Sequence, residues 1–194
     1  ARWDKILANR NDSSDSQLIK GLEHFVKGSA YINTGDLEKA LTEYSKLEIL
    51  ALDENTRDMQ IYSNSVQDIL LIARNVLNAE LAVASGEIEK AIALYYQAII
   101  SEDNLNYMEP PEWRFPVRRE LGSLLLKLGR AQEATMIFWE DLRRHPENGW
   151  ALHGVFNGTR QTKDLEEMQQ ADNRFKKAWE HSDTELDDAR AKRL

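Results

Sequence analysis

The sequence predicts an all-α protein built from about four helical hairpins, and three observations lead to this prediction. The 194 residues include only four prolines and nine glycines, so long helices can run uninterrupted. Clusters of the β-branched residues that favour strands are sparse. The third observation is a repeated spacing of small and aromatic residues, which is typical of helix pairs stacked on one another. The length suits one domain with a sizeable core.

Composition and charge exclude several classes of function. Acidic residues number 33 against 25 basic ones, and the formal net charge of -8 would repel a polyphosphate, so we expect no nucleic-acid partner. The chain has no cysteine, which excludes disulfides and thiolate metal sites. No apolar run approaches the ~20 residues of a membrane span. These features leave the compartment unknown, since both cytoplasm and periplasm are compatible with them.

Residues 115–148 carry the most complete copy of the repeated spacing. Small, aromatic and turn-forming residues follow one another as in the tetratricopeptide-repeat (TPR) pattern of ~34 residues, in which two antiparallel helices form a hairpin. The markers are Leu121, Gly122 and Leu125 in the first helix, Gly129 in the turn, Ala134 and Phe138 in the second helix, and Pro146 beyond it.

Two further copies cover residues 21–54 and 72–105. Their second-helix alanines and that of the third copy, Ala40, Ala91 and Ala134, stand 51 and 43 residues apart, which exceeds the repeat length. We therefore expect inserts at 55–71 and 106–114. The other markers of the two copies are Gly28, Tyr31, Gly35 and Tyr44 in the first, and Ala79, Ala82, Gly86 and Tyr95 in the second.

A degenerate hairpin is expected over residues 149–182, with Lys163-Asp164 in place of the glycine turn. The loss of small residues indicates a capping hairpin that needs no further neighbour. The prediction is thus one TPR domain over 1–194, wound as a right-handed superhelix. The first seven residues resemble the end of a helix already under way, so we interpret the chain as part of a longer protein. Residues 184–194 are expected to form a polar helical tail.

The repeat assigns a packing role to each marker. In each hairpin two small residues let the helices approach closely, because a bulky side chain there would cost ~1–3 kcal/mol of strain. Large aromatic residues then fill the gap toward the next hairpin, and glycines end the first helices in the left-handed conformation. The contact pairs are Gly28/Ala40, Ala79/Ala91 and Gly122/Ala134, the gap-filling residues are Tyr44, Tyr95 and Phe138, and the turn glycines are Gly35, Gly86 and Gly129.

Each insert has its own expected structure. In the first, Thr56 or Ser65 could cap a long helix that runs to about Ser85, after an irregular turn near residues 62–64. In the second, adjacent prolines force an extended course between crowded aromatic residues. These aromatic residues either seal a gap between hairpins or contact a ligand. The ligand-contact candidates are Tyr107, Glu109 and Trp113.

Two longer motifs are more specific than the repeat itself. They are Glu109-Pro-Pro-x-Trp113…Pro116-Val-Arg118…Leu121-Gly122 and Glu140-Asp-Leu142…Pro146-Glu-Asn-Gly-Trp150. With them, residues 61–179 resemble a C-terminal segment of certain bacterial TPR proteins of unassigned function. The resemblance implies the TPR fold and a bacterial source. Family members continue with a recognisable repeat after Gly154, where this chain has Asn157-Gly-Thr-Arg-Gln-Thr-Lys163 instead.

No catalytic constellation is visible. The chain lacks a phosphate-binding glycine loop, a Gly-x-Ser-x-Gly elbow and a His-Glu-x-x-His pair. The four histidines are scattered, and no carboxylate completes a metal set around His145 and His153. Glu109 and Glu112 are expected to be solvated or paired with Arg114 or Arg118. We therefore expect no enzyme activity, no metal and no cofactor.

The TPR pattern implies a concave groove lined by first helices. Its groove positions correspond to Phe25, Ser29 and Asn33, then Val76, Glu80 and Ala84, then Arg119, Ser123 and Lys127, and finally Trp150, His153, Asn157 and Arg160. The last seven form a basic, amide-bearing half. This half suggests an acidic peptide, a free C-terminal carboxylate or another anion, held by Arg119, Lys127 and Arg160. Arg119 and Lys127 could instead only neutralise nearby acids.

The groove departs from the carboxylate-clamp pattern of chaperone-binding repeats, because Glu80 intrudes and the paired lysine and asparagine positions are incomplete. The functional hypothesis is a non-catalytic scaffold that binds a protein or peptide. The alternative is a structural or oligomerisation module, or an accessory domain of a larger protein. The partner and the oligomeric state stay open.

Overall fold

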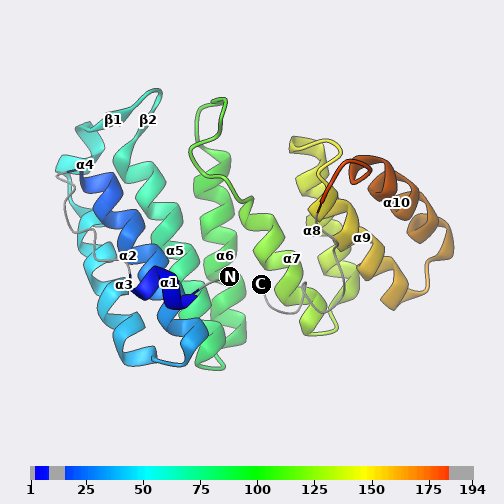
Figure 1. The fold of residues 1–194 in the computed structure, drawn as a ribbon, viewed down its shortest axis with the longest axis horizontal. Coiled ribbons are helices and arrows are strands. Elements are labelled where there is room, and N and C mark those ends of the chain that lie inside the picture. The colour runs from blue at the N-terminus through cyan, green and yellow to red at the C-terminus, as the bar shows by residue number, and fades with distance from the viewer. Residues whose placement is uncertain (1–2, 9–15, 184–194) are drawn as a thin grey trace. The chain divides into compact units, whose positions relative to one another are not determined.

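Helices make up most of the residues that the computed structural model describes, which are 3–8 and 16–183 (Figure 1). Within this part the all-α prediction is confirmed. Eight of the helices pair as sequential hairpins. These are α2 (Gln17–Thr34) with α3 (Leu37–Leu52), α5 (Val66–Ala84) with α6 (Ile88–Asp103), α7 (Val117–Lys127) with α8 (Ala131–Arg144), and α9 (Gly149–Thr162) with α10 (Leu165–Ala178).

The chain divides into two compact units, Ala1–Arg114 and Phe115–Leu194. The boundary falls at the end of the second predicted insert. Each unit holds two of the four hairpins, and a single continuous superhelix stays a prediction. The first unit also contains α1 (Trp3–Ala8), which packs on α2. The predicted tail at 184–194 lies outside the described residues.

The turns within the hairpins follow the sequence closely. Gly35, Gly86 and Gly129 have φ angles of 85°, 78° and 74°, a left-handed conformation that glycine adopts without strain. In the fourth hairpin Lys163 takes this conformation with φ 62°, and Asp164 caps α10 by accepting a hydrogen bond from the backbone N–H of Glu167. The predicted turn at Lys163-Asp164 is therefore confirmed.

The core of the first unit joins α2, α3 and α5. Two glycines of α2 lie against two leucines of α5: Gly21 faces Leu70, and a Cβ built on Gly28 would lie 2.7 Å from Cδ2 of Leu77. The prediction for Gly28 was wrong in this respect. The absence of a side chain at Gly28 lets α5, the first helix of the next hairpin, approach α2. The side chain nearest to Gly28 is Leu77 of α5 and not a residue of its partner helix α3.

Polar contacts join the same hairpins. The Tyr44 hydroxyl on α3 donates to Glu48 at 2.7 Å and accepts from Asn78 on α5 at 3.2 Å. Burial and the bond to Glu48 raise the pKa of Tyr44 to about 12, so the phenol stays protonated. The prediction that Tyr44 reaches the next hairpin is confirmed.

The first insert folds into a short helix and a two-stranded hairpin. Helix α4 (Asn55–Asp58) leads into β1 (Gln60–Ile61), which pairs antiparallel with β2 (Asn64–Ser65). The irregular turn was expected at this place, but its strands were not. Of the two predicted caps, Thr56 and Ser65, it is Ser65 that caps α5: its hydroxyl accepts from the Asp68 N–H, and the Asp68 carboxylate accepts from the Ser65 N–H. The long helix to about Ser85 is confirmed.

The two inserts bond directly to each other, although 42 residues separate the partners. The Asn64 side chain accepts from the Asn106 backbone N–H at 2.7 Å and donates to the Asn106 carbonyl at 3.1 Å. Its amide also donates to Glu112 at 3.1 Å, and the Asn106 amide donates to the Ser63 carbonyl at 2.7 Å. Glu112 is thus paired with Asn64 and not with an arginine. Glu109 accepts from Tyr107 and is exposed to solvent, which was one of the two expectations for it.

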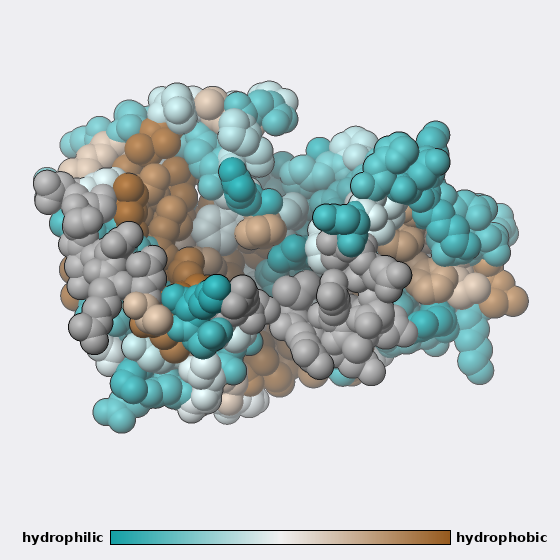
Figure 2. All heavy atoms as spheres, in the orientation of Figure 1, coloured by the Kyte–Doolittle hydropathy of each residue, from teal (hydrophilic) through white to brown (hydrophobic). Residues whose placement is uncertain are grey.

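The core of the second unit is built around Phe138. Its ring lies between α7 and α9, where a Cβ on either Gly122 or Gly154 would be 2.5 Å from the ring. Phe138 therefore both fills its own hairpin and reaches the next one, as predicted. Elsewhere in this unit Trp179 lies against Gly149, and the exposed side chains of α10 are mostly hydrophilic, with Leu165 as the large apolar exception (Figure 2). A polar outer face is what a capping hairpin requires.

Candidate functional site

All seven residues of the predicted basic half lie in the second unit, on α7 and α9. These two helices pack against each other, which brings their side chains onto neighbouring positions within one unit. They are Arg119, Ser123 and Lys127 on α7, and Trp150, His153, Asn157 and Arg160 on α9. We call this set the α7/α9 face.

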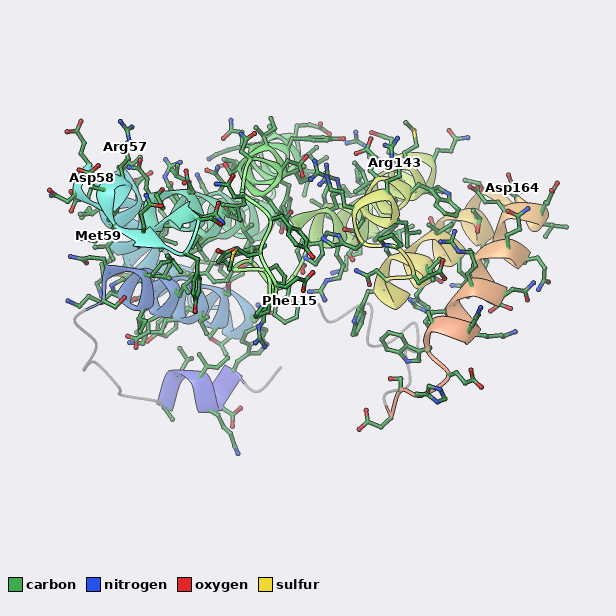
Figure 3. All side chains as sticks on the ribbon, turned by 90° about the horizontal axis from the view of Figure 1, so that it is seen from above. Arg57, Asp58, Met59, Phe115, Arg143 and Asp164 are labelled. Atoms are coloured by element: carbon green, nitrogen blue, oxygen red, sulfur yellow. The ribbon has the colours of Figure 1, made fainter. Side chains whose placement is uncertain are left out.

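Arg119 is held by two aromatic rings. Its guanidinium carbon lies 5.0 Å from the ring centre of Phe115, which precedes α7 (Figure 3), and 5.5 Å from that of Trp150. Cation–π contacts of this kind favour a fixed, charged guanidinium. Nε and Nη2 both donate to one oxygen of Glu120, at 3.3 and 2.7 Å. Within the described residues, Nη1 donates no hydrogen bond.

An aromatic cluster continues from Trp150 toward α10. Trp150 meets Trp179 edge to face at 5.5 Å between ring centres, and Trp179 stacks on Phe175 at 5.6 Å. Phe175 in turn lies 5.4 Å from the imidazole of His153. Such ring pairs have few rotatable bonds, so they form a rigid support for Arg119. The sequence did not predict the contribution of α10 to this site.

His153 and Asn157 are both buried. The Asn157 amide nitrogen lies 3.2 and 3.4 Å from the two ring nitrogens of His153. Asn157 is 7% exposed, and its amide oxygen has no hydrogen-bond partner among the described residues. Turning the amide over would exchange oxygen and nitrogen but leave one polar atom unbonded. A buried amide oxygen without a partner is costly unless a water molecule satisfies it.

The remaining members of the face differ in exposure. Ser123 is half-buried in the middle of α7, while Lys127 and Arg160 are exposed near the ends of their helices. The Arg160 guanidinium lies 5.7 Å from the ring centre of Phe156. The face therefore has a rigid end around Arg119 and an exposed basic end around Lys127 and Arg160.

A buried carboxylate supports the rigid end from α8. Asp141 is 1% exposed and accepts hydrogen bonds from Nδ1 of His145 at 2.8 Å and from the amide of Asn148 at 3.3 Å. Burial raises the pKa of Asp141, and the bond from His145 and the charges of Arg118 and Arg119 oppose this rise only in part. Asn148 is also the N-cap of α9, so Asp141 fixes the point where α9 begins.

The groove positions predicted in the first unit contact other residues of that unit. Trp113 of the second insert packs on Phe25, with ring centres 5.4 Å apart, and on the core of that unit. The Ser29 hydroxyl donates to Glu80 at 2.6 Å. Three residues of the second insert were predicted to contact a ligand. Of these, Trp113 packs against the core of the first unit, whereas Tyr107 and Glu109 are exposed and form a hydrogen bond with each other.

The described residues contain no group of three or more histidine, aspartate or glutamate side chains placed to hold a metal ion. In the same part of the chain, each helix is too short or too polar to cross a membrane. No family model matches the sequence, and no curated protein or solved structure matches it significantly.

Proposed function

We propose that the chain is a non-catalytic TPR scaffold and that its second unit binds an acidic peptide segment along the α7/α9 face. The TPR assignment and the likeness to bacterial TPR proteins rest on the sequence spacing and the two longer motifs. The observed hairpins, the left-handed glycine turns and the position of Phe138 support it. A scaffold of rigid helices suits binding, because its side chains need little ordering when a ligand arrives.

The position of Arg119 is the observation that carries the proposal. Two rings hold its guanidinium in one orientation, and Glu120 engages only Nε and Nη2. A peptide carboxylate could accept from Nη1 and form a charge-assisted hydrogen bond, which is about twice as strong as a neutral one. Lys127 and Arg160 would add attraction for further acidic residues.

We expect the affinity for acidic peptides to depend on Arg119. Fluorescence anisotropy with a peptide array of varied charge, each peptide with a free or an amidated C-terminus, should identify an acidic ligand. Replacing Arg119 by glutamine should weaken that ligand about tenfold or more, because a hydrogen bond to a charged group contributes ~1.5–3 kcal/mol.

The matched control is Arg143→Gln, which removes the same charge from an exposed position on α8. Equal loss in the two variants would mean that only net charge matters. A preference of the wild type for basic peptides would contradict the proposal.

A second function, oligomerisation, is favoured by apolar side chains on α3. Leu41, Ile49 and Leu52 are all exposed and lie on one side of the helix, since they are separated by eight and three residues. Light scattering should show a dimer or larger species for the wild type and a monomer for Ile49→Glu if this stripe joins copies of the chain. A monomeric wild type at high concentration would exclude it.

A further inference from the structure

The two most exposed large aromatic side chains of the described residues lie on the two inserts. Tyr62 is 83% exposed and Tyr107 is 82% exposed. Neither belongs to the α7/α9 face, and neither contributes to a core. An exposed tyrosine on a loop is a frequent contact residue in protein interfaces, because it offers a large amphipathic surface with few rotatable bonds.

The inserts hold these tyrosines on adjoining backbone segments. Tyr62 precedes Ser63, whose carbonyl accepts from the Asn106 side chain at 2.7 Å, and Asn106 precedes Tyr107. The β1–β2 hairpin and the loop after α6 rise from the same end of the first unit (Figure 1). The side chains of Asn64 and Asn106 lock the two loops together through several hydrogen bonds. The tyrosines therefore form part of one pre-organised surface, which we call the insert surface.

The negative charge around this surface indicates the kind of partner that it would attract. Residues 53–62 and 102–114 contain seven acidic residues and two basic ones, Arg57 and Arg114. Glu109 and Glu112 accept hydrogen bonds from neutral groups, the Tyr107 hydroxyl and the Asn64 amide, so these bonds leave their charges in place. Figure 3 shows Arg57, Asp58 and Met59 at a corner of the first unit, beside the β1–β2 hairpin. Tyrosine rings among carboxylates attract guanidinium groups through both charge and cation–π contact.

We propose that the insert surface, centred on Tyr62 and Tyr107, docks an arginine-bearing segment of a partner protein. This proposal does not depend on the acidic peptide proposed for the second unit, because it concerns a different partner and different residues. The rings select arginine over other residues by stacking on its planar guanidinium, and the carboxylates raise the local concentration of cationic segments. The surface is built by the two inserts that interrupt the repeat, which explains why they are joined so firmly.

The probes are two short synthetic peptides, one alternating arginine with glycine and the other alternating glutamate with glycine. Binding to the full chain is measured by isothermal titration. The test variant combines Tyr62→Asn with Tyr107→Ser, which leaves the net charge unchanged. Asparagine also tolerates the positive φ of 53° at position 62. The matched control is Tyr96→Ser, an exposed tyrosine on α6.

The expected result is binding of the arginine peptide, weakened about tenfold in the double variant and unchanged in Tyr96→Ser. Circular dichroism should show equal helicity in all three proteins. Three results would overturn the proposal. They are no binding of the arginine peptide, binding of the glutamate peptide with equal strength, or the same affinity in the double variant as in the wild type. In the last case the acidic residues alone would attract the peptide.

Discussion

Replacing Phe138 by alanine is expected to lower the free energy of unfolding by about 3–5 kcal/mol, the usual loss for a buried phenylalanine. The ring is 2% exposed and lies between α7 and α9, where two glycines leave no side chains of their own to fill the space. Urea denaturation followed by circular dichroism measures the change. Met136→Ala on the same helix is the control, because Met136 is exposed and should change stability by less than about 0.5 kcal/mol.

A double-mutant cycle tests the same contact from the other side. Gly122→Ala should destabilise the wild type, because its Cβ would lie 2.5 Å from the Phe138 ring. In the Phe138→Ala background the same change should become stabilising by up to about 1 kcal/mol, since alanine favours helix over glycine. Additive effects of the two substitutions would show that Gly122 and Phe138 are not in contact.

Replacing Asp141 by alanine is expected to cost about 3 kcal/mol of stability. The change removes the acceptor for His145 and Asn148 inside the protein and takes away a negative charge that lies near Arg118 and Arg119. Loss of one member of a buried charged group leaves the others uncompensated. Thermal and urea unfolding measure the effect.

Asp141→Asn separates charge from hydrogen bonding. It keeps one acceptor oxygen and the side-chain volume, so it should lose about half as much stability as Asp141→Ala. A loss below about 0.5 kcal/mol for the alanine variant, as for an ordinary surface substitution, would show that the cluster does not hold the start of α9 in place.

Local signals predicted most of the fold. The glycine turns, the Ser65 cap and the Ala134/Phe138 spacing each depend on residues a few positions apart, and the structure has them where the sequence placed them. The role of Gly28 was misassigned because the repeat marks a position as small without saying which helix approaches it. Only the packed structure shows that Leu77 of α5 does so.

The candidate site was predicted less completely, for a physical reason. Helical spacing placed Arg119 and Trp150 on two neighbouring helices, and the structure brings them within 5.5 Å. The support from Asp141 and the rings of α10 depends on contacts between hairpins, for which the sequence has no local pattern. The bond between Asn64 and Asn106 likewise joins two irregular loops, whose course no periodicity predicts.

The central claim is that the α7/α9 face binds an acidic peptide through Arg119. The most direct test is a nuclear magnetic resonance titration of the chain with the acidic peptide selected from the array. It follows the Arg119 Nε–H signal and the indole N–H signals of Trp150 and Trp113. The claim predicts that Arg119 and Trp150 shift together and saturate with one dissociation constant, while Trp113 in the first unit stays unchanged. A peptide that binds and shifts Trp113 but neither Arg119 nor Trp150 would contradict it.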